Sequence, residues 1–148
     1  MQQLIRFAES PQPESFAAVP FAESVWLGLS RRLVVNHPRE MLADPSSWVL
    51  SAPHFRAYVG PFSALDLLAE MDARFGPDAP PAGSLEVNVG PHPHCASPPV
   101  PPPARLKDLR RVSAQPTDID SCILWWTVDA FVDVNGTIRA ITLDLWEP

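Results

Sequence analysis

The strongest constraint in this sequence is the dipeptide Asn135-Gly136, which lies between two runs of alternating apolar and polar residues. Asn-Gly in such a position is the strongest short-range signal of a β-hairpin, because both residues tolerate the positive φ angles of a tight turn. We therefore expect a C-terminal hairpin with strands over residues 122–134 and 137–147. The two strands are expected to pair residue for residue on either side of a two-residue loop.

This pairing gives the hairpin two unequal faces, because side chains alternate along each strand. One face is mostly apolar and is expected to pack on helices; it carries Leu124, Trp126, Val128, Ala130, Val132 and Val134 opposite Leu145, Leu143, Ile141, Arg139 and Thr137. The other face mixes aromatic, hydroxyl and acidic side chains: Trp125, Thr127, Asp129, Phe131, Asp133, Thr142, Asp144 and Trp146. We expect Asp129 and Asp144 to be diagonal neighbours, with Cβ atoms about 5.5–8 Å apart.

Three interpretations of the mixed face remain open. It is an ordinary sheet face, with its tryptophans covered by a Pro-rich segment. It is a binding surface, in which aromatic rings supply contact area and acids supply specificity. In the third interpretation Asp129 and Asp144 perform acid–base chemistry, which requires an environment that separates their pKa values.

Upstream of the hairpin, the patterns predict a mixture of helices and short strands. Residues 1–19 are expected to be an irregular lead-in with a short strand at Leu4–Phe7, and Phe21, Val25, Leu29 and Leu33 recur at helical spacing over about residues 20–33. A further helix begins at Ser63, followed three residues later by Asp66. Shorter elements are expected as a helical turn at 38–42, strands at 48–51, 54–59 and 84–90, and a short helix or strand at 106–112. The order predicts an α+β fold, with a mainly antiparallel sheet, flat or strongly curved, packed on two or three helices in a single domain over 1–148.

Residues 91–104 form a Pro-rich loop, which cannot join a sheet interior because proline lacks a backbone donor. It contains His92, His94 and Cys95, and Cys122 follows later with Asp118 and Asp120. These residues fit no strong zinc spacing, so we expect no metal and no cofactor, and a metalloprotein centred on His92, His94 and Cys95 is the weaker alternative. Two other functions of these cysteines are open: Cys95 could be a nucleophile with His92 or His94 as its base, or Cys95 and Cys122 could form a disulfide. We expect both thiols to be reduced, because the cytoplasm keeps thiols reduced.

The net charge of −6 argues against binding nucleic acid or anionic membranes, which both attract basic surfaces. The chain has neither the basic start of a signal peptide nor an apolar run long enough to span a bilayer, so we expect a cytoplasmic protein. Lys107 is the only lysine among eleven basic residues, and Ala and Pro are abundant, as is typical of a GC-rich bacterial genome.

The hairpin over Val128–Asp133, Asn135-Gly136 and Ile138–Pro148 resembles the end of nuclear-transport-factor-like (SnoaL-type) domains. The resemblance covers roughly the last 25 residues, and the N-terminal half and the Pro-rich loop depart from it. It implies a cone-shaped fold with a pocket between the sheet and the helices, and it implies no catalytic residue.

The leading functional prediction is a small, acidic, non-enzymatic protein-binding module. A homodimer is compatible with this prediction. One form would be an immunity- or antitoxin-like inhibitor of a basic effector. Its binding residues would be on the mixed face and the adjoining loop: Trp125, Thr127, Asp129, Phe131, Thr142, Asp144, Trp146, His92 and His94. The alternative is a SnoaL-like small-molecule binder or enzyme, with a pocket lined by Trp125, Phe131, Asp129, Asp144 and Trp146.

Overall fold

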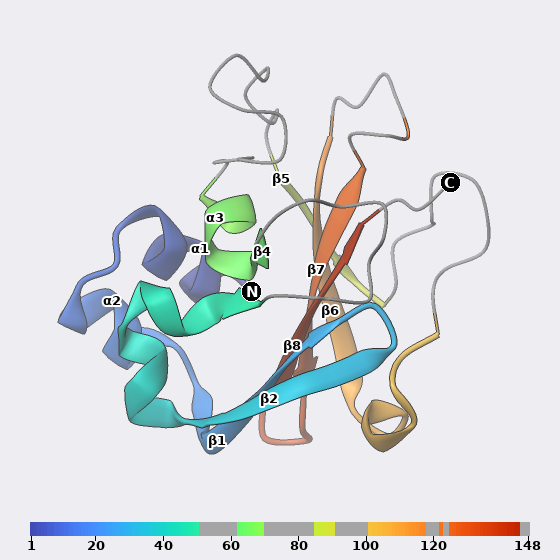
Figure 1. Ribbon diagram of the computed structural model, residues 1–148, viewed down its shortest axis with the longest axis horizontal. Coiled ribbons are helices and arrows are strands. Elements are labelled where there is room, and N and C mark those ends of the chain that lie inside the picture. Colours follow the sequence, from blue (N-terminus) through green and yellow to red (C-terminus); the bar gives the residue numbers. More distant parts are fainter. Residues whose placement is uncertain (51–61, 70–84, 91–100, 118–121, 123–124, 146–148) are drawn as a thin grey trace.

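A six-stranded sheet organises the molecule (Figure 1). The computed structural model describes residues 1–50, 62–69, 85–90, 101–117, 122 and 125–145. In spatial order the strands are β2 (Arg32–Pro38), β1 (Phe21–Leu29), β8 (Ile138–Leu145), β7 (Trp126–Val132), β6 (Arg110–Pro116) and β5 (Leu85–Val89). Neighbours are antiparallel except β1 and β8, which run parallel. The predicted α+β class with a mainly antiparallel sheet and a C-terminal hairpin is confirmed.

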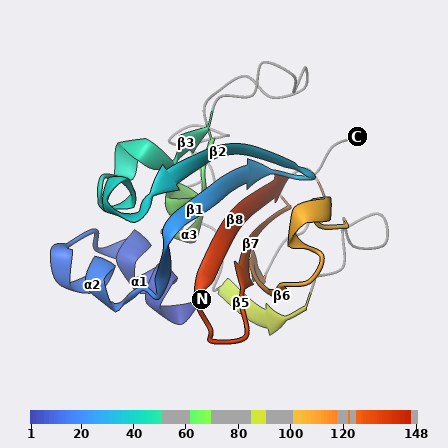
Figure 2. The ribbon, with the colours of Figure 1, turned by 90° about the horizontal axis from the view of Figure 1, so that it is seen from below.

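Among the described residues, three α-helices lie on one face of the sheet: α1 (Gln2–Glu9), α2 (Pro13–Ala18) and α3 (Ala64–Leu68). Figure 2 shows them on one side of the sheet, while the short 3-10 helix η4 (Ala104–Leu106) lies on the other side. Two further 3-10 helices, η1 (Arg39–Ala43) and η2 (Pro45–Trp48), lead into the small β3 (Val49–Leu50) and β4 (Phe62–Ser63) pair. We call the face that carries α1, α2 and α3 the helical side of the sheet, and the opposite face the η4 side.

The main core fills the space between the helices and the sheet. Its largest fully buried side chains include Phe7 of α1, Trp48 of η2 and Trp126 of β7. The Trp48 indole N–H donates to the Leu42 carbonyl at 2.9 Å, so this buried polar group is satisfied. From the hairpin, Val128, Leu143 and Leu145 join this core, as the predicted apolar face requires.

The N-terminal predictions were wrong. Residues 2–9 form a helix rather than a lead-in with a strand at Leu4–Phe7, and this helix buries Leu4, Ile5, Phe7 and Ala8. Residues 21–38 form the β1–β2 hairpin rather than a helix over 20–33. Positions four apart lie on one face of a helix and also on one face of a strand, so the recurrence at residues 21, 25 and 29 fits both. The strand is decided by the intervening positions, because Leu27 is buried beside Val25 and Leu29 while Trp26 faces the other way.

The C-terminal hairpin has a longer loop than predicted. The Gly136 N–H donates to the Asp133 carbonyl at 3.0 Å, and Gly136 has φ +80°, so Val134-Asn135-Gly136 form a three-residue loop with a glycine bulge. Val134 is consequently fully exposed rather than in the core. A second irregularity makes Arg139 the extra residue of β8, and the predicted pairing holds from Phe131 opposite Ala140 outward.

Several shorter predictions can also be compared with the structure. A helical turn is present at η1, Ser63 accepts a hydrogen bond from the Asp66 N–H at the start of α3, and β5 lies within the strand predicted at 84–90. Residues 106–112 divide between the end of η4 and the start of β6. The strand predicted at 54–59 and the later part of the helix after Ser63 lie outside the described residues.

Candidate functional site

The carboxylate of Asp129 lies in a buried polar cluster on the η4 side of the sheet. Its side chain is 1% exposed and accepts hydrogen bonds from Arg111 Nη2 and Ser113 Oγ, with Thr127 Oγ1 at 3.4 Å. Strand pairing places Ser113 directly opposite Asp129, which explains how the short serine side chain reaches it. Arg111 and Asp129 also form an ion pair from which water is largely excluded.

Asp144 is tied to a different part of the fold. Its Oδ1 accepts a hydrogen bond of 2.5 Å from Ser30 Oγ, and its side chain is 4% exposed. Ser30 lies in the β1–β2 turn with φ +48°, and its N–H donates to the Leu143 carbonyl at 2.7 Å. Asp144 therefore fastens that turn to the central strand β8.

The pairing of these residues is the predicted one. Asp129 is opposite Thr142 and Thr127 is opposite Asp144, so the two carboxylates are diagonal neighbours. Thr127 and Thr142 are buried as well. Asp129 accepts from hydroxyl and guanidinium donors, and Asp144 accepts from the Ser30 hydroxyl through Oδ1. Both carboxylates are buried, so neither lies on the exposed surface in this conformation.

The other predicted site residues are divided between described and undescribed parts of the chain. Trp125 is 5% exposed, and Phe131 is 1% exposed with the Arg111 guanidinium 5.9 Å from its ring centroid. Trp146, His92, His94 and Cys95 lie outside the described residues, as do Asp118 and Asp120. Within the described ranges no group of three His, Cys, Asp or Glu side chains is arranged to hold a metal.

The prediction of reduced thiols is wrong for Cys122, which is disulfide-bonded. The sequence has one other cysteine, Cys95. The prediction rested on an assumed reducing compartment, because nothing in the local sequence indicates whether a thiol is oxidised.

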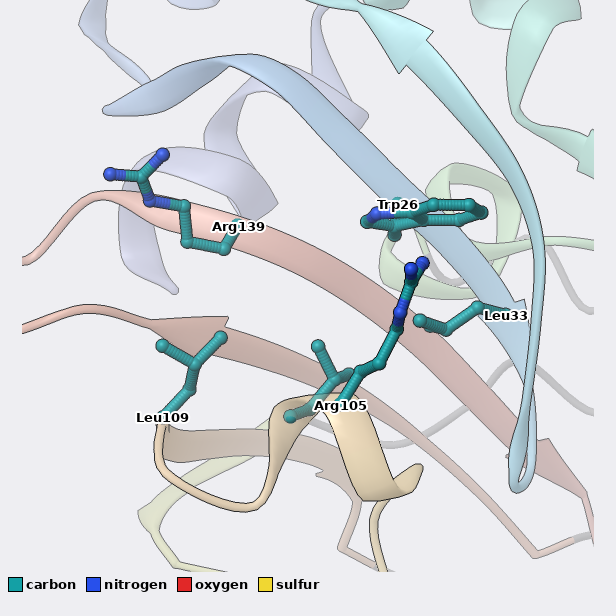
Figure 3. A pocket seen from close by; sticks show the side chains of 6 residues that line it. Trp26, Leu33, Arg105, Leu109 and Arg139 are labelled. Atoms are coloured by element: carbon teal, nitrogen blue, oxygen red, sulfur yellow. The ribbon is translucent and has the colours of Figure 1, made fainter.

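The sequence analysis did not predict a pocket that lies on the η4 side of the sheet, the same face as Asp129. It has a volume of about 490 Å³ and is lined by Trp26, Leu33, Arg105, Leu106, Leu109 and Arg139 (Figure 3). Its floor is a second apolar cluster, in which Leu106 packs on Phe131 and Ala140. Strands β1, β2 and β8 supply one wall, and η4 with the following loop supplies the other.

Two arginines line this pocket and have different surroundings. The Arg105 guanidinium carbon lies 5.4 Å from the centroid of the Trp26 ring, a cation–π arrangement. Arg139 is held by Asp133, whose Oδ2 accepts from Arg139 Nε at 2.9 Å. In Figure 3 the Arg105 side chain extends toward Trp26, whereas Arg139 extends away from Arg105.

The Asp133 carboxylate accepts hydrogen bonds from the backbone of the hairpin loop. Its Oδ1 accepts from the backbone N–H groups of Asn135 and Thr137, at 2.9 and 3.0 Å. The hydrogen bond from Thr137 is the largest cause that lowers the pKa of Asp133 below its usual value, and Arg139 lowers it further. Asp133 is therefore ionised at neutral pH and compensates the charge of Arg139.

Two signals in the sequence mark the β1 side of the pocket. Trp26 alternates with the buried Val25 and Leu27, which is a strand pattern with an aromatic side chain on the second face. Gly28 follows on that second face, where a Cβ would lie 2.5 Å from the Arg32 carbonyl oxygen. A glycine within a strand often marks such a close backbone approach.

Comparisons with protein-family models, with curated proteins and with solved structures find no match for this chain. The resemblance of the closing hairpin to SnoaL-type domains therefore stays a prediction. Among the described residues, no helix has the length and apolar character needed to cross a bilayer.

Proposed function

We propose that this protein is a non-enzymatic binding protein whose ligand site is the pocket between η4 and the sheet. The proposal rests on the pocket itself, in which an apolar floor, the Trp26 ring and the Arg105 guanidinium surround one open space of about 490 Å³. Small-molecule sites in proteins have similar volumes and a similar mixture of apolar walls with a few polar groups.

The lining supports binding rather than catalysis. Its six residues comprise one tryptophan, three leucines and two arginines, so none offers a carboxylate, hydroxyl, thiol or imidazole for nucleophilic or acid–base chemistry. Asp133 beside the pocket is paired with Arg139, and Asp129 and Asp144 on the same sheet face accept hydrogen bonds from protein side chains. A pocket of this composition can hold and orient a ligand.

An immunity- or antitoxin-like function is a second proposal, and it would need a different surface from the one first expected. Asp129 and Asp144 are buried, but Glu9, Glu14 and Glu40 are exposed in α1, α2 and η1. These elements lie on the helical side of the sheet (Figure 2), so a basic partner would dock there and leave the pocket free. If so, Glu14→Lys with Glu40→Lys should abolish capture of that partner, and Arg105→Gln should not affect capture.

The cellular location is also a proposal. A disulfide at Cys122 favours an oxidising compartment over the cytoplasm that the sequence suggested, because cytoplasmic thiols are normally kept reduced. Alkylation of free thiols in intact cells before lysis tests this point. If Cys122 is labelled, its thiol is free in the cell, and a cytoplasmic location is favoured instead.

NMR fragment mapping on the full chain tests the pocket proposal. A panel of neutral, cationic and anionic apolar fragments is titrated into ¹⁵N-labelled protein, and the Trp26 indole N–H is assigned with Trp26→Phe. We expect fragments to shift that signal together with the amides of Leu33, Leu106 and Leu109. If every fragment leaves these signals in place, the pocket is not a ligand site.

A further inference from the structure

The loop that closes the pocket is strongly basic in a protein of net charge −6. Four of the eleven basic residues lie within residues 105–111, where Asp108 is the only acid. Arg105 lines the pocket, and Lys107 is exposed two residues further along the same segment. The mouth of the pocket therefore has a positive local field, which raises the local concentration of anions.

Only one of the two lining arginines has its charge available. Arg139 is paired with Asp133, whose carboxylate is ionised at neutral pH. Arg105 makes no ion pair with any described residue, and its contact is the Trp26 ring. The Arg105 guanidinium lies over the Trp26 ring without an ion-pair partner among the described residues, and its N–H donors match the two oxygens of a carboxylate.

The remainder of the pocket is apolar. Leu33, Leu106 and Leu109 surround the space, and Phe131 and Ala140 lie beneath Leu106. Burial of a ligand's hydrocarbon part against these side chains is favourable in proportion to the area removed from water. One free cation above an apolar floor selects a ligand with one negative charge and an apolar body.

We propose that the pocket binds a small monocarboxylic acid, with its carboxylate on Arg105 and its apolar body on Leu33, Leu106 and Leu109. This inference rests on the proposed function, because it names the ligand class of the same pocket. Arg105 sets the preference for an acid, and Trp26 holds the Arg105 guanidinium in place. Lys107 attracts the anion from a distance without touching it.

Calorimetric titration of the full chain with 4-phenylbutanoate tests the charge requirement, with 4-phenylbutanamide as its uncharged counterpart and acetate as the charge without an apolar body. We expect the acid to bind at least about tenfold more tightly than the amide, since hydrogen bonds to charged groups are the stronger ones. Acetate should bind far more weakly than the acid. Equal affinity for acid and amide would overturn the inference, as would no binding of the acid.

Variants then test whether Arg105 is the residue that binds the carboxylate of the ligand. Arg105→Gln should lose about tenfold or more in affinity for the acid and leave the amide unchanged. Lys107→Gln is the matched control, since it removes the same charge from an exposed, non-lining position two residues away and should cost less than about twofold in affinity. Arg139→Gln should also have a small effect. Circular dichroism verifies that each variant is folded, and loss of affinity that is equal in Arg105→Gln and Lys107→Gln would refute the inference.

The fragment panel separates failure of this inference from failure of the proposed function. If neutral or cationic fragments shift the Trp26 indole and 4-phenylbutanoate does not, the pocket is a ligand site and the monocarboxylate assignment is wrong. If no fragment shifts these signals, both are wrong.

Discussion

The buried ion pair between Arg111 and Asp129 gives the sharpest stability prediction. Arg111→Met keeps most of the side-chain volume and removes the guanidinium, which leaves a carboxylate that is 1% exposed. Removal of one partner of a buried pair costs about 3–5 kcal/mol. Ser113 and Thr127 still donate toward Asp129, so we expect the lower part of this range, about 3 kcal/mol.

Urea unfolding followed by tryptophan fluorescence measures this loss. With a slope of about 1–3 kcal/mol per M for a small protein, the unfolding midpoint should fall by about 1–3 M. Arg110→Met is the matched control, because Arg110 is the exposed neighbour on the same strand and its loss should cost under about 0.5 kcal/mol.

The double variant Arg111→Met with Asp129→Asn completes the test. It removes both charges, so it should recover most of the stability lost in Arg111→Met. The reasoning is refuted if Arg111→Met and Arg110→Met unfold at the same urea concentration, or if the double variant is no more stable than Arg111→Met.

Three further perturbations test other parts of the structure. The lowered pKa of Asp133, caused chiefly by the Thr137 N–H, means that its carboxylate stabilises the fold above about pH 3.8 and that this contribution is lost as pH falls through the lower folded value. Asp133→Asn should therefore be less stable than the parent at pH 6, and the difference in urea midpoint should shrink as pH falls below 3.8. Gly28→Ala brings a Cβ within 2.5 Å of the Arg32 carbonyl oxygen and should cost about 1–3 kcal/mol, while equal stability would show that the strands can separate there. Reduction of the Cys122 disulfide should lower stability by about 2–4 kcal/mol, and thiol titration before reduction should find no free thiol at that position.

The sequence was most informative about the closing hairpin. Asn135-Gly136 located the turn, and alternation correctly placed Trp126, Val128 and Leu143 in the core. The loop length was wrong because Asn-Gly also fits a type I turn followed by a glycine bulge, and the second irregularity at Arg139 then restored the expected pairing. The alternating pattern therefore specified which residues face each other, whereas the longer loop is held by local hydrogen bonds from Asn135 and Thr137 to Asp133.

Features that depend on long-range contacts were not predictable from the sequence. The four-residue recurrence at 21, 25 and 29 is shared by helices and strands, and the pairing of β1 with both β2 and β8 stabilises the strand through contacts that the sequence does not show. The pocket joins residues near 26–33, 105–109 and 139, which no local pattern connects. The burial of Asp129 likewise depends on Arg111 and Ser113 from the neighbouring strand, so the sequence could place its carboxylate on a face without showing its partners.

The most direct test of the proposed site is a titration of ¹⁵N-labelled protein with 4-phenylbutanoate, followed at the Trp26 indole N–H and the amides of Leu33, Leu106 and Leu109. Binding in the pocket predicts saturable shifts that are confined to these signals and their neighbours, and that are strongly weakened in Arg105→Gln. Shifts that cluster instead on α1 and α2, or that are equal in the parent and Arg105→Gln, would contradict a ligand site beside Trp26.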